Sequence, residues 1–149
     1  MEQVSLHQVK TIVLVEDEDL VRRLVTRLLE KEGYRVIEAV TGEEGLEIVG
    51  SGEKVDLLLT DITLPGSMSG LELGWRALEE RSDLKLICMS GSGEDEMVSD
   101  LLARAVGATA FLNKPFSSGE LVKTVNSLLD PGQESQQAED HFPGLDLTG

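Results

Sequence analysis

The sequence predicts an α/β fold in which five helices cover a doubly wound, five-stranded parallel sheet over residues 8–130. Short β-branched runs alternate strictly with segments whose apolar residues recur at helical spacing, which is typical of this class. Three of the predicted strands are nearly continuous apolar runs, so both faces of the sheet are expected to be covered. Short connections and right-handed crossovers then leave few possible topologies.

The first four elements each have a local signal. "TIVLVED" at 11–17 is a β-branched run that ends in acids, and it predicts the first strand. "YRVIEA" at 34–39 predicts the second strand. Thr41 and Glu44 form a capping box that opens the second helix, which runs to about Gly50. The first helix is predicted over 19–32 from an apolar stripe at helical spacing, formed by Leu20, Val21, Leu24, Val25, Leu28 and Leu29.

The remaining six elements continue the alternation. Strands are predicted at 55–60, 84–90 and 108–113, where the sequence reads "VDLLLT", "LKLICMS" and "ATAFLN". A helix is predicted over 71–81, and the last helix is opened by a second capping box at Ser117 and Glu120. The helix between the last two strands shows an apolar stripe formed by Met97, Val98, Leu101, Leu102 and Val106.

Composition excludes several classes of protein. The formal net charge of −15 argues against a nucleic-acid partner, because 13 basic residues against 28 acids give no general positive field. No apolar run approaches the roughly 18 residues of a membrane span, so membrane insertion is not expected. The single cysteine, Cys88, fits a reducing cytoplasm. Residues 131–149 carry four acids and no Lys or Arg, which predicts an acidic, disordered tail or linker.

Polar side chains follow four of the predicted strands. In a doubly wound sheet the carboxyl ends of the strands meet at one crevice, so these side chains are expected to converge there. Three carboxylates about 5 Å apart repel one another by roughly 3 kcal/mol per pair at an effective dielectric near 20. A hard divalent cation such as Mg²⁺ offsets this repulsion and accepts oxygen ligands. The converging residues are Glu16, Asp17, Asp61, Ser90 and Lys114.

This set has the parts needed for phosphoryl transfer: a nucleophilic carboxylate, a metal site, a hydroxyl and a lysine. Each member alone has a plainer interpretation. The acids at 16–19 favour the N-terminus of the first helix, and Asp61 before a Pro-Gly loop is a common turn former. Ser90 and Lys114 taken singly are ordinary surface residues. Their joint placement at successive strand ends favours the functional interpretation.

These motifs resemble the response-regulator receiver domains of two-component signalling over roughly residues 10–130. The resemblance rests on "VLVEDE", "VDLLLTDITLPG", "ICMSGSG" and "AFLNKPF", which occur in the family's order. It implies a flavodoxin-like sheet with strand order 2-1-3-4-5. It also implies a cytoplasmic signalling domain that accepts a phosphoryl group from a histidine kinase or histidine phosphotransfer domain and then changes its affinity for a downstream protein. Turnover of an external substrate is not expected.

The resemblance implies a role for each matching residue. Asp61 is the residue phosphorylated, and Phe111 is the switch aromatic residue. Ser90 and Lys114 bind phosphoryl oxygens, and the bond from Lys114 to Pro115 is cis. Mg²⁺ is held directly by Asp17, through water by Glu16, and also by Asp61 and the main-chain carbonyl of Thr63.

Three features depart from the commoner pattern. Glu16 stands where Asp is more usual. The loop "LPGSMSG" is one residue longer, as in receivers similar to those of hybrid histidine kinases. Phe111 has no hydroxyl group, so the switch is expected to work by packing.

Other interpretations are less consistent with the residues. Phosphatases of the haloacid dehalogenase type use Asp, Ser or Thr, and Lys in this order, but they carry an acid where Thr63 stands. A flavin- or nucleotide-binding domain needs a Gly- or Ser-rich loop after the first strand, where "VEDEDL" would repel an anion. A receiver that folds but is not phosphorylated is a further alternative. The sequence leaves open whether the domain acts alone or as part of a hybrid kinase.

Overall fold

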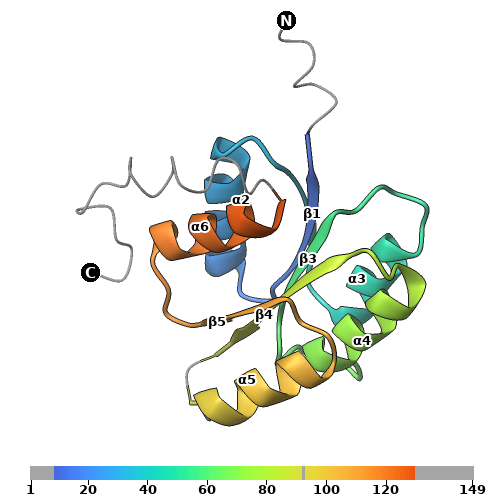
Figure 1. Ribbon diagram of the computed structural model, residues 1–149, viewed down its shortest axis with the longest axis vertical. Helices are drawn as coiled ribbons and strands as arrows, with labels where there is room; N and C mark the ends of the chain where they lie inside the picture. The colour runs from blue at the N-terminus through green and yellow to red at the C-terminus, as the bar shows by residue number, and fades with distance from the viewer. Residues whose placement is uncertain (1–8, 92, 130–149) are drawn as a thin grey trace, which may run out of the picture.

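A single parallel sheet organises the chain in the computed structural model, which describes residues 9–91 and 93–129. Its five strands lie in the order β2-β1-β3-β4-β5 (Figure 1). The strands are β1 (Thr11–Val15), β2 (Arg35–Ala39), β3 (Leu57–Asp61), β4 (Lys85–Ser90) and β5 (Ala110–Asn113). The helices are α2 (Asp19–Lys31), α3 (Gly42–Val49), α4 (Gly70–Glu80), α5 (Glu96–Ala105) and α6 (Ser118–Leu129).

The predicted fold class and strand order are confirmed, and the ends of the elements agree to within two residues. The largest differences are at strand ends, where Glu16 and Asp17 follow β1 instead of ending it, and residue 55 precedes β3. Asp56 ends the preceding loop because its carboxylate accepts a hydrogen bond from the Thr11 N–H at 2.8 Å. The predicted tail at 131–149 lies outside the described residues.

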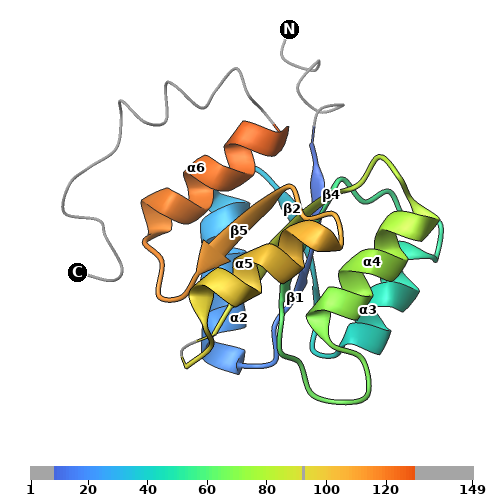
Figure 2. The ribbon, with the colours of Figure 1, turned by 60° about the horizontal axis from the view of Figure 1, so that its bottom comes forward.

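The pleat of the strands divides the core into two layers, one on each face of the sheet. In β1, for example, Ile12 and Leu14 point to one face and Val13 and Val15 to the other. Helices α2 and α6 cover the first face, and α3, α4 and α5 cover the second (Figures 1 and 2). Because β1, β3 and β4 are buried on both faces, the residues that follow their carboxyl ends emerge at one fixed edge of the sheet.

Two helices expose much of the apolar surface that their sequences contain. In α2, Val25 and Leu29 are buried, whereas Leu20 is 80% exposed and Leu24 is 45% exposed. In α5 the buried residues are Ser99 and Ala103, and the predicted stripe of Met97, Val98, Leu101 and Leu102 faces outward. Among the described residues, no helix has both the length and the apolar character to cross a bilayer.

The loop between β3 and α4 is packed tightly against the end of β3. The N–H of Gly70 donates a hydrogen bond to the carbonyl oxygen of Ile62 at 2.7 Å. A Cβ atom at Gly70 would lie 1.6 Å from the carbonyl oxygen of Asp61, far inside van der Waals contact. This position therefore requires glycine for steric reasons, and the contact fixes the backbone at Asp61.

Replacing Gly70 with Ala should lower the free energy of unfolding by about 2–4 kcal/mol, because the added methyl group meets backbone that has no side chain to displace. Urea unfolding followed by circular dichroism would measure the change. Gly91→Ala is the matched control, since no heavy atom lies within 4 Å of a Cβ there, and it should change the value by less than about 0.5 kcal/mol. Equal stability of the two variants would contradict the close contact.

Candidate functional site

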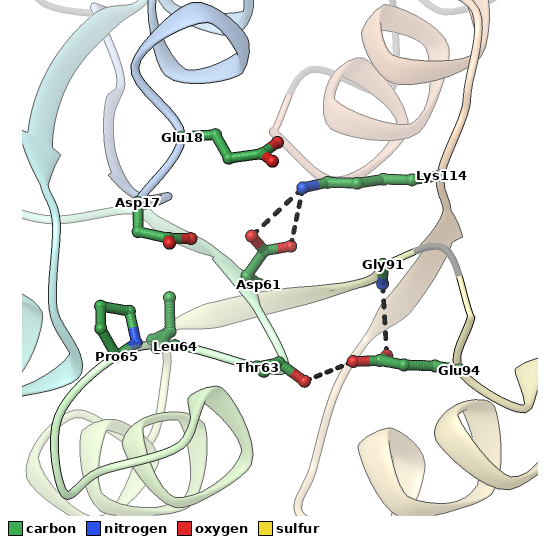
Figure 3. A pocket seen from close by; sticks show the side chains of 9 residues that line it. All are labelled: Asp17, Glu18, Asp61, Thr63, Leu64, Pro65, Gly91, Glu94 and Lys114. Carbon is green, nitrogen blue, oxygen red and sulfur yellow. Dashed lines mark hydrogen bonds and ion pairs between the residues drawn. The ribbon is translucent and has the colours of Figure 1, made fainter.

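A cleft of about 480 Å³ opens at the carboxyl ends of the strands (Figure 3). The residues that line it come from four separate segments of the chain. They include Asp17 after β1, Asp61 at the end of β3, Thr63 in the following loop, Gly91 and Glu94 after β4, and Lys114 after β5. The convergence predicted from the strand ends is thus present for the acids and the lysine.

Three carboxylates form the acidic wall of this site. One oxygen of each of Glu16, Asp17 and Asp61 lies within 4.8 Å of the others. Glu16 is fully buried, and its Oε2 accepts a hydrogen bond from the N–H of Glu18 at 3.0 Å. Arg22 in α2 donates to the carbonyl oxygen of Glu16 at 3.0 Å. These bonds fix the loop after β1 and hold its acids towards β3.

Lys114 connects two of these acids. Its Nζ lies 2.7 Å from Glu16 Oε1 and donates a hydrogen bond to Asp61 Oδ2 at 3.1 Å. Burial lowers the pKa of Lys114, but the hydrogen bond to Glu16 and the negative charge of Asp61 outweigh it, so the net shift is upward. The ammonium group therefore stays charged at neutral pH and offsets part of the repulsion between the carboxylates.

Asp61 is held in an unusual electrostatic environment. Burial, and then the neighbouring charge of Glu16, raise its pKa to about 7, although Lys114 opposes the shift. Its Oδ1 lies 3.0 Å from Lys114 Nζ in an ion pair but accepts no hydrogen bond. A buried carboxylate oxygen with unused acceptor capacity, close to two further carboxylates, fits the all-oxygen ligand preference of a hard divalent cation.

The hydroxyl of Ser90 is engaged within the sheet, and its predicted contact with a phosphoryl oxygen stays a prediction. Ser90 is fully buried at the end of β4, and its hydroxyl donates a hydrogen bond to Oδ1 of Asn113 on the neighbouring strand. The parallel register pairs these two residues directly. Ser90 is not among the residues that line the cleft. Sequence analysis identified Lys114 at the end of β5 but missed Asn113, which the same strand-end rule covers.

Glu94 is a second residue that sequence analysis missed. Its carboxylate accepts a hydrogen bond from the Thr63 hydroxyl with one oxygen and from the Gly91 N–H with the other, the latter at 3.2 Å (Figure 3). It therefore joins the loop after β3 to the loop after β4. No periodic pattern marks this position, because Glu94 lies between two elements.

The two remaining predicted residues lie on β5 and just after it. Phe111 is partly buried and packs against the core layer beneath α3, α4 and α5. The bond between Lys114 and Pro115 is cis. The roles that the resemblance assigns to these residues remain predictions.

The chain is similar to known signalling proteins. Residues 12–126 match the sequence model of the response regulator receiver domain. The sensor kinase CckA of Brucella abortus is 40% identical over 121 residues, which are 80% of this chain but 12% of that protein. The chain spans about half the length of other curated relatives that it matches.

Solved structures give the same family. A response regulator receiver domain protein of Clostridium thermocellum superposes with a TM-score of 0.75 at 25% identity, covering 84% of this chain and 98% of that one. A response regulator of Burkholderia pseudomallei, solved with a phosphorylated aspartic acid, a calcium ion and citrate, gives a TM-score of 0.68 at 26% identity. This second match covers 88% of this chain and 72% of the other.

Replacing Asp61 with Asn should stabilise the metal-free protein at alkaline pH. The pKa of Asp61 in the folded protein lies above its ordinary value, so ionisation of Asp61 disfavours folding. This penalty is absent below about pH 4, grows between about pH 4 and 7, and is complete above about pH 7. The variant should therefore match wild type near pH 4 and gain about 1–3 kcal/mol at pH 8. The gain is limited because Lys114 loses an ion-pair partner.

Denaturant unfolding at pH 4, 6 and 8 in the presence of a chelator would measure this difference. Asp83→Asn is the matched control, since Asp83 is an exposed acid outside the cleft. A gain of the same size at pH 4 and pH 8 would show that burial and charge do not act on Asp61 as described.

Proposed function

Because the chain belongs to the response regulator receiver domain family of two-component systems, we propose that Asp61 accepts a phosphoryl group from a phosphohistidine donor. Receiver domains are signalling domains, and histidine kinases and phosphotransfer proteins are the partners of the family. The observation that carries the proposal is the buried Asp61 carboxylate, which lies in an open cleft beside Lys114 and has one oxygen without a hydrogen bond. No turnover of an external substrate is part of this proposal.

The transfer needs an ionised carboxylate and a neutralised phosphoryl group. An oxygen of Asp61 forms a bond to phosphorus while the bond from phosphorus to the donor's imidazole nitrogen breaks, and that nitrogen keeps the electron pair. Lys114 already contacts Asp61, so its ammonium group is placed to pair with a phosphoryl oxygen. Its interaction with Glu16 keeps it at the site before the phosphoryl group arrives.

We propose that Asp17, Asp61, the main-chain carbonyl of Thr63 and, through water, Glu16 hold Mg²⁺ in this cleft. The separation of at most 4.8 Å between the three carboxylates and the unused acceptor capacity of Asp61 support this assignment. The ion would favour the ionised form of Asp61 and reduce repulsion of the incoming phosphate. The Burkholderia relative, solved with a phosphorylated aspartic acid and a calcium ion, supports a site of this kind.

We propose that the donor domain docks on α2 beside the cleft. A second, apolar cleft of about 240 Å³ lies between α2 and the start of the segment after β5, lined by Leu24, Leu28, Pro115 and Phe116 among others. Lys114 lines both clefts, so a domain bound to this apolar surface would be adjacent to Asp61. A histidine kinase or histidine phosphotransfer domain fits this position because its phosphohistidine must reach Asp61.

The output surface is proposed on the opposite side of the cleft. Phosphorylation adds charge and acceptor oxygens near Ser90 and the loop that leads to α5, which shifts a balance between conformations. Met97 and Leu101 on α5 are 75% and 66% exposed, so this helix offers apolar surface to a downstream protein. We place these events in the cytoplasm, where a reducing environment suits the single buried thiol of Cys88.

Incubation with acetyl phosphate and Mg²⁺ should add one phosphate to the chain. The groups around Asp61 that would bind the transferred phosphoryl group are the same whether it comes from a small molecule or from a protein. Intact-mass spectrometry would detect it. Asp61→Asn should abolish the addition, and excess chelator should reduce it at least tenfold. The control Asp83→Asn should be labelled like wild type. Labelling that survives in Asp61→Asn would move the site elsewhere, and no labelling of wild type would indicate a receiver that folds without being phosphorylated.

A further inference from the structure

Two neutral hydrogen-bond donors of the cleft are already occupied by an acid of the same chain. They are the N–H of Gly91 and the hydroxyl of Thr63, two of the described residues that line the cleft with Lys114. Both donate to the carboxylate of Glu94 (Figure 3). Glu94 therefore takes up, with its two oxygens, the hydrogen bonds that an anionic ligand at this position would seek.

A phosphoryl group on Asp61 makes competing demands on the same donors. Near neutral pH such a group carries a charge of about −1.5 to −2 and three strong acceptor oxygens. Glu94, Asp17 and Glu18 also line the cleft, which has Lys114 as its cation among the described residues. The phosphoryl group and the Glu94 carboxylate would repel each other and cannot both use the N–H of Gly91, so one must leave.

We propose that Glu94 is a positioning residue that holds the unphosphorylated site by acting as an internal competitor for the phosphoryl group. This inference rests on the proposed phosphorylation of Asp61. Displacement of Glu94 has a direct structural consequence, because the next residue, Asp95, caps α5 by accepting hydrogen bonds from Met97 and Val98 N–H at 3.0 and 3.1 Å. Loss of the Glu94 contacts thus transmits occupancy of the cleft to the start of α5.

The test uses beryllofluoride with Mg²⁺, a non-covalent substitute for the phosphoryl group, and measures its affinity by NMR titration. Glu94→Gln and Glu94→Ala should both bind it about five- to tenfold more tightly, because each removes a charged competitor for two donors. Glu96→Gln is the matched control: it makes the same change in net charge two residues further along the chain, on an exposed residue outside the cleft, and should change affinity less than twofold.

The outcomes separate this inference from the proposed function. If wild type binds beryllofluoride, Asp61→Asn does not, and both Glu94 variants equal wild type, the competitor role fails while the phosphorylation site stands. If Glu96→Gln gains as much as Glu94→Gln, the effect is general charge and the role also fails. If wild type does not bind and Asp61 is not phosphorylated, both proposals fall together. Thermal unfolding of each variant checks that its fold is intact.

A separate observation gives Asn113 a related role. Ser90 has one hydroxyl proton, and it is donated to Asn113 Oδ1 in a position where the hydroxyl is fully buried. The two strands are held together at this level by a hydrogen bond from the Lys114 N–H to the Ser90 carbonyl oxygen at 3.1 Å. Ser90 can donate to a phosphoryl oxygen only after the bond to Asn113 breaks. We infer that Asn113 positions the Ser90 hydroxyl away from the cleft and so disfavours the phosphorylated arrangement.

A double-mutant cycle with beryllofluoride as the probe tests this role, which also rests on the proposed function. Asn113→Ala should raise affinity about fivefold, since one hydrogen bond that opposes binding is lost. In a Ser90→Ala background, Asn113→Ala should not change the affinity for beryllofluoride, because residue 90 then has no hydroxyl group for Asn113 to bind. An equal gain in both backgrounds would show that Asn113 acts without Ser90, and no gain in either would also overturn the role. Binding of beryllofluoride by wild type and not by Asp61→Asn would confirm that the probe reports on the proposed site.

Discussion

The contact of one ammonium group with two carboxylates is the interaction on which the site depends. Lys114 lies between Glu16 and Asp61 and thereby joins the ends of β5, β1 and β3. Without a cation there, the acids of the cleft would repel one another by roughly 3 kcal/mol per pair. The sheet tolerates this repulsion because apolar packing on both of its faces holds the strands in place. The repelling charges lie only at the strand ends.

The same arrangement explains the chemical character of Asp61. A carboxylate on the surface would ionise fully at neutral pH and would bind water. Here burial and Glu16 raise its pKa to about 7, and one oxygen accepts no hydrogen bond. A divalent ion and a phosphoryl group would each relieve a different part of this environment. These features of Asp61 support the proposed binding of both groups.

Much of the fold followed from the sequence, and so did the acids and lysine of the site. Periodicity predicted every described element, and the strand-end rule brought Asp17, Asp61 and Lys114 into one cleft. The sequence patterns did not reveal two features of the site, the direction of the Ser90 hydroxyl and the bonds of Glu94. The direction of the Ser90 hydroxyl depends on its rotamer and on Asn113 across the sheet, and no pattern within one strand contains that contact. Glu94 lies in a loop, where its bonds depend on how two separate turns approach each other.

The apolar stripes show a related limit, because periodicity reveals that a helix face is apolar and not whether another element covers it.

The tight fit of Gly70 against the carbonyl of Asp61 makes the two walls of the cleft mechanically different. Backbone contact at Gly70 fixes one wall of the cleft, whereas a Cβ atom at Gly91 or Gly93, after β4, would meet no heavy atom within 4 Å. With Asp61 as the proposed phosphorylation site, we expect displacement at Gly91 and Glu94 and not at Gly70, whose backbone contact with Asp61 leaves no room for movement.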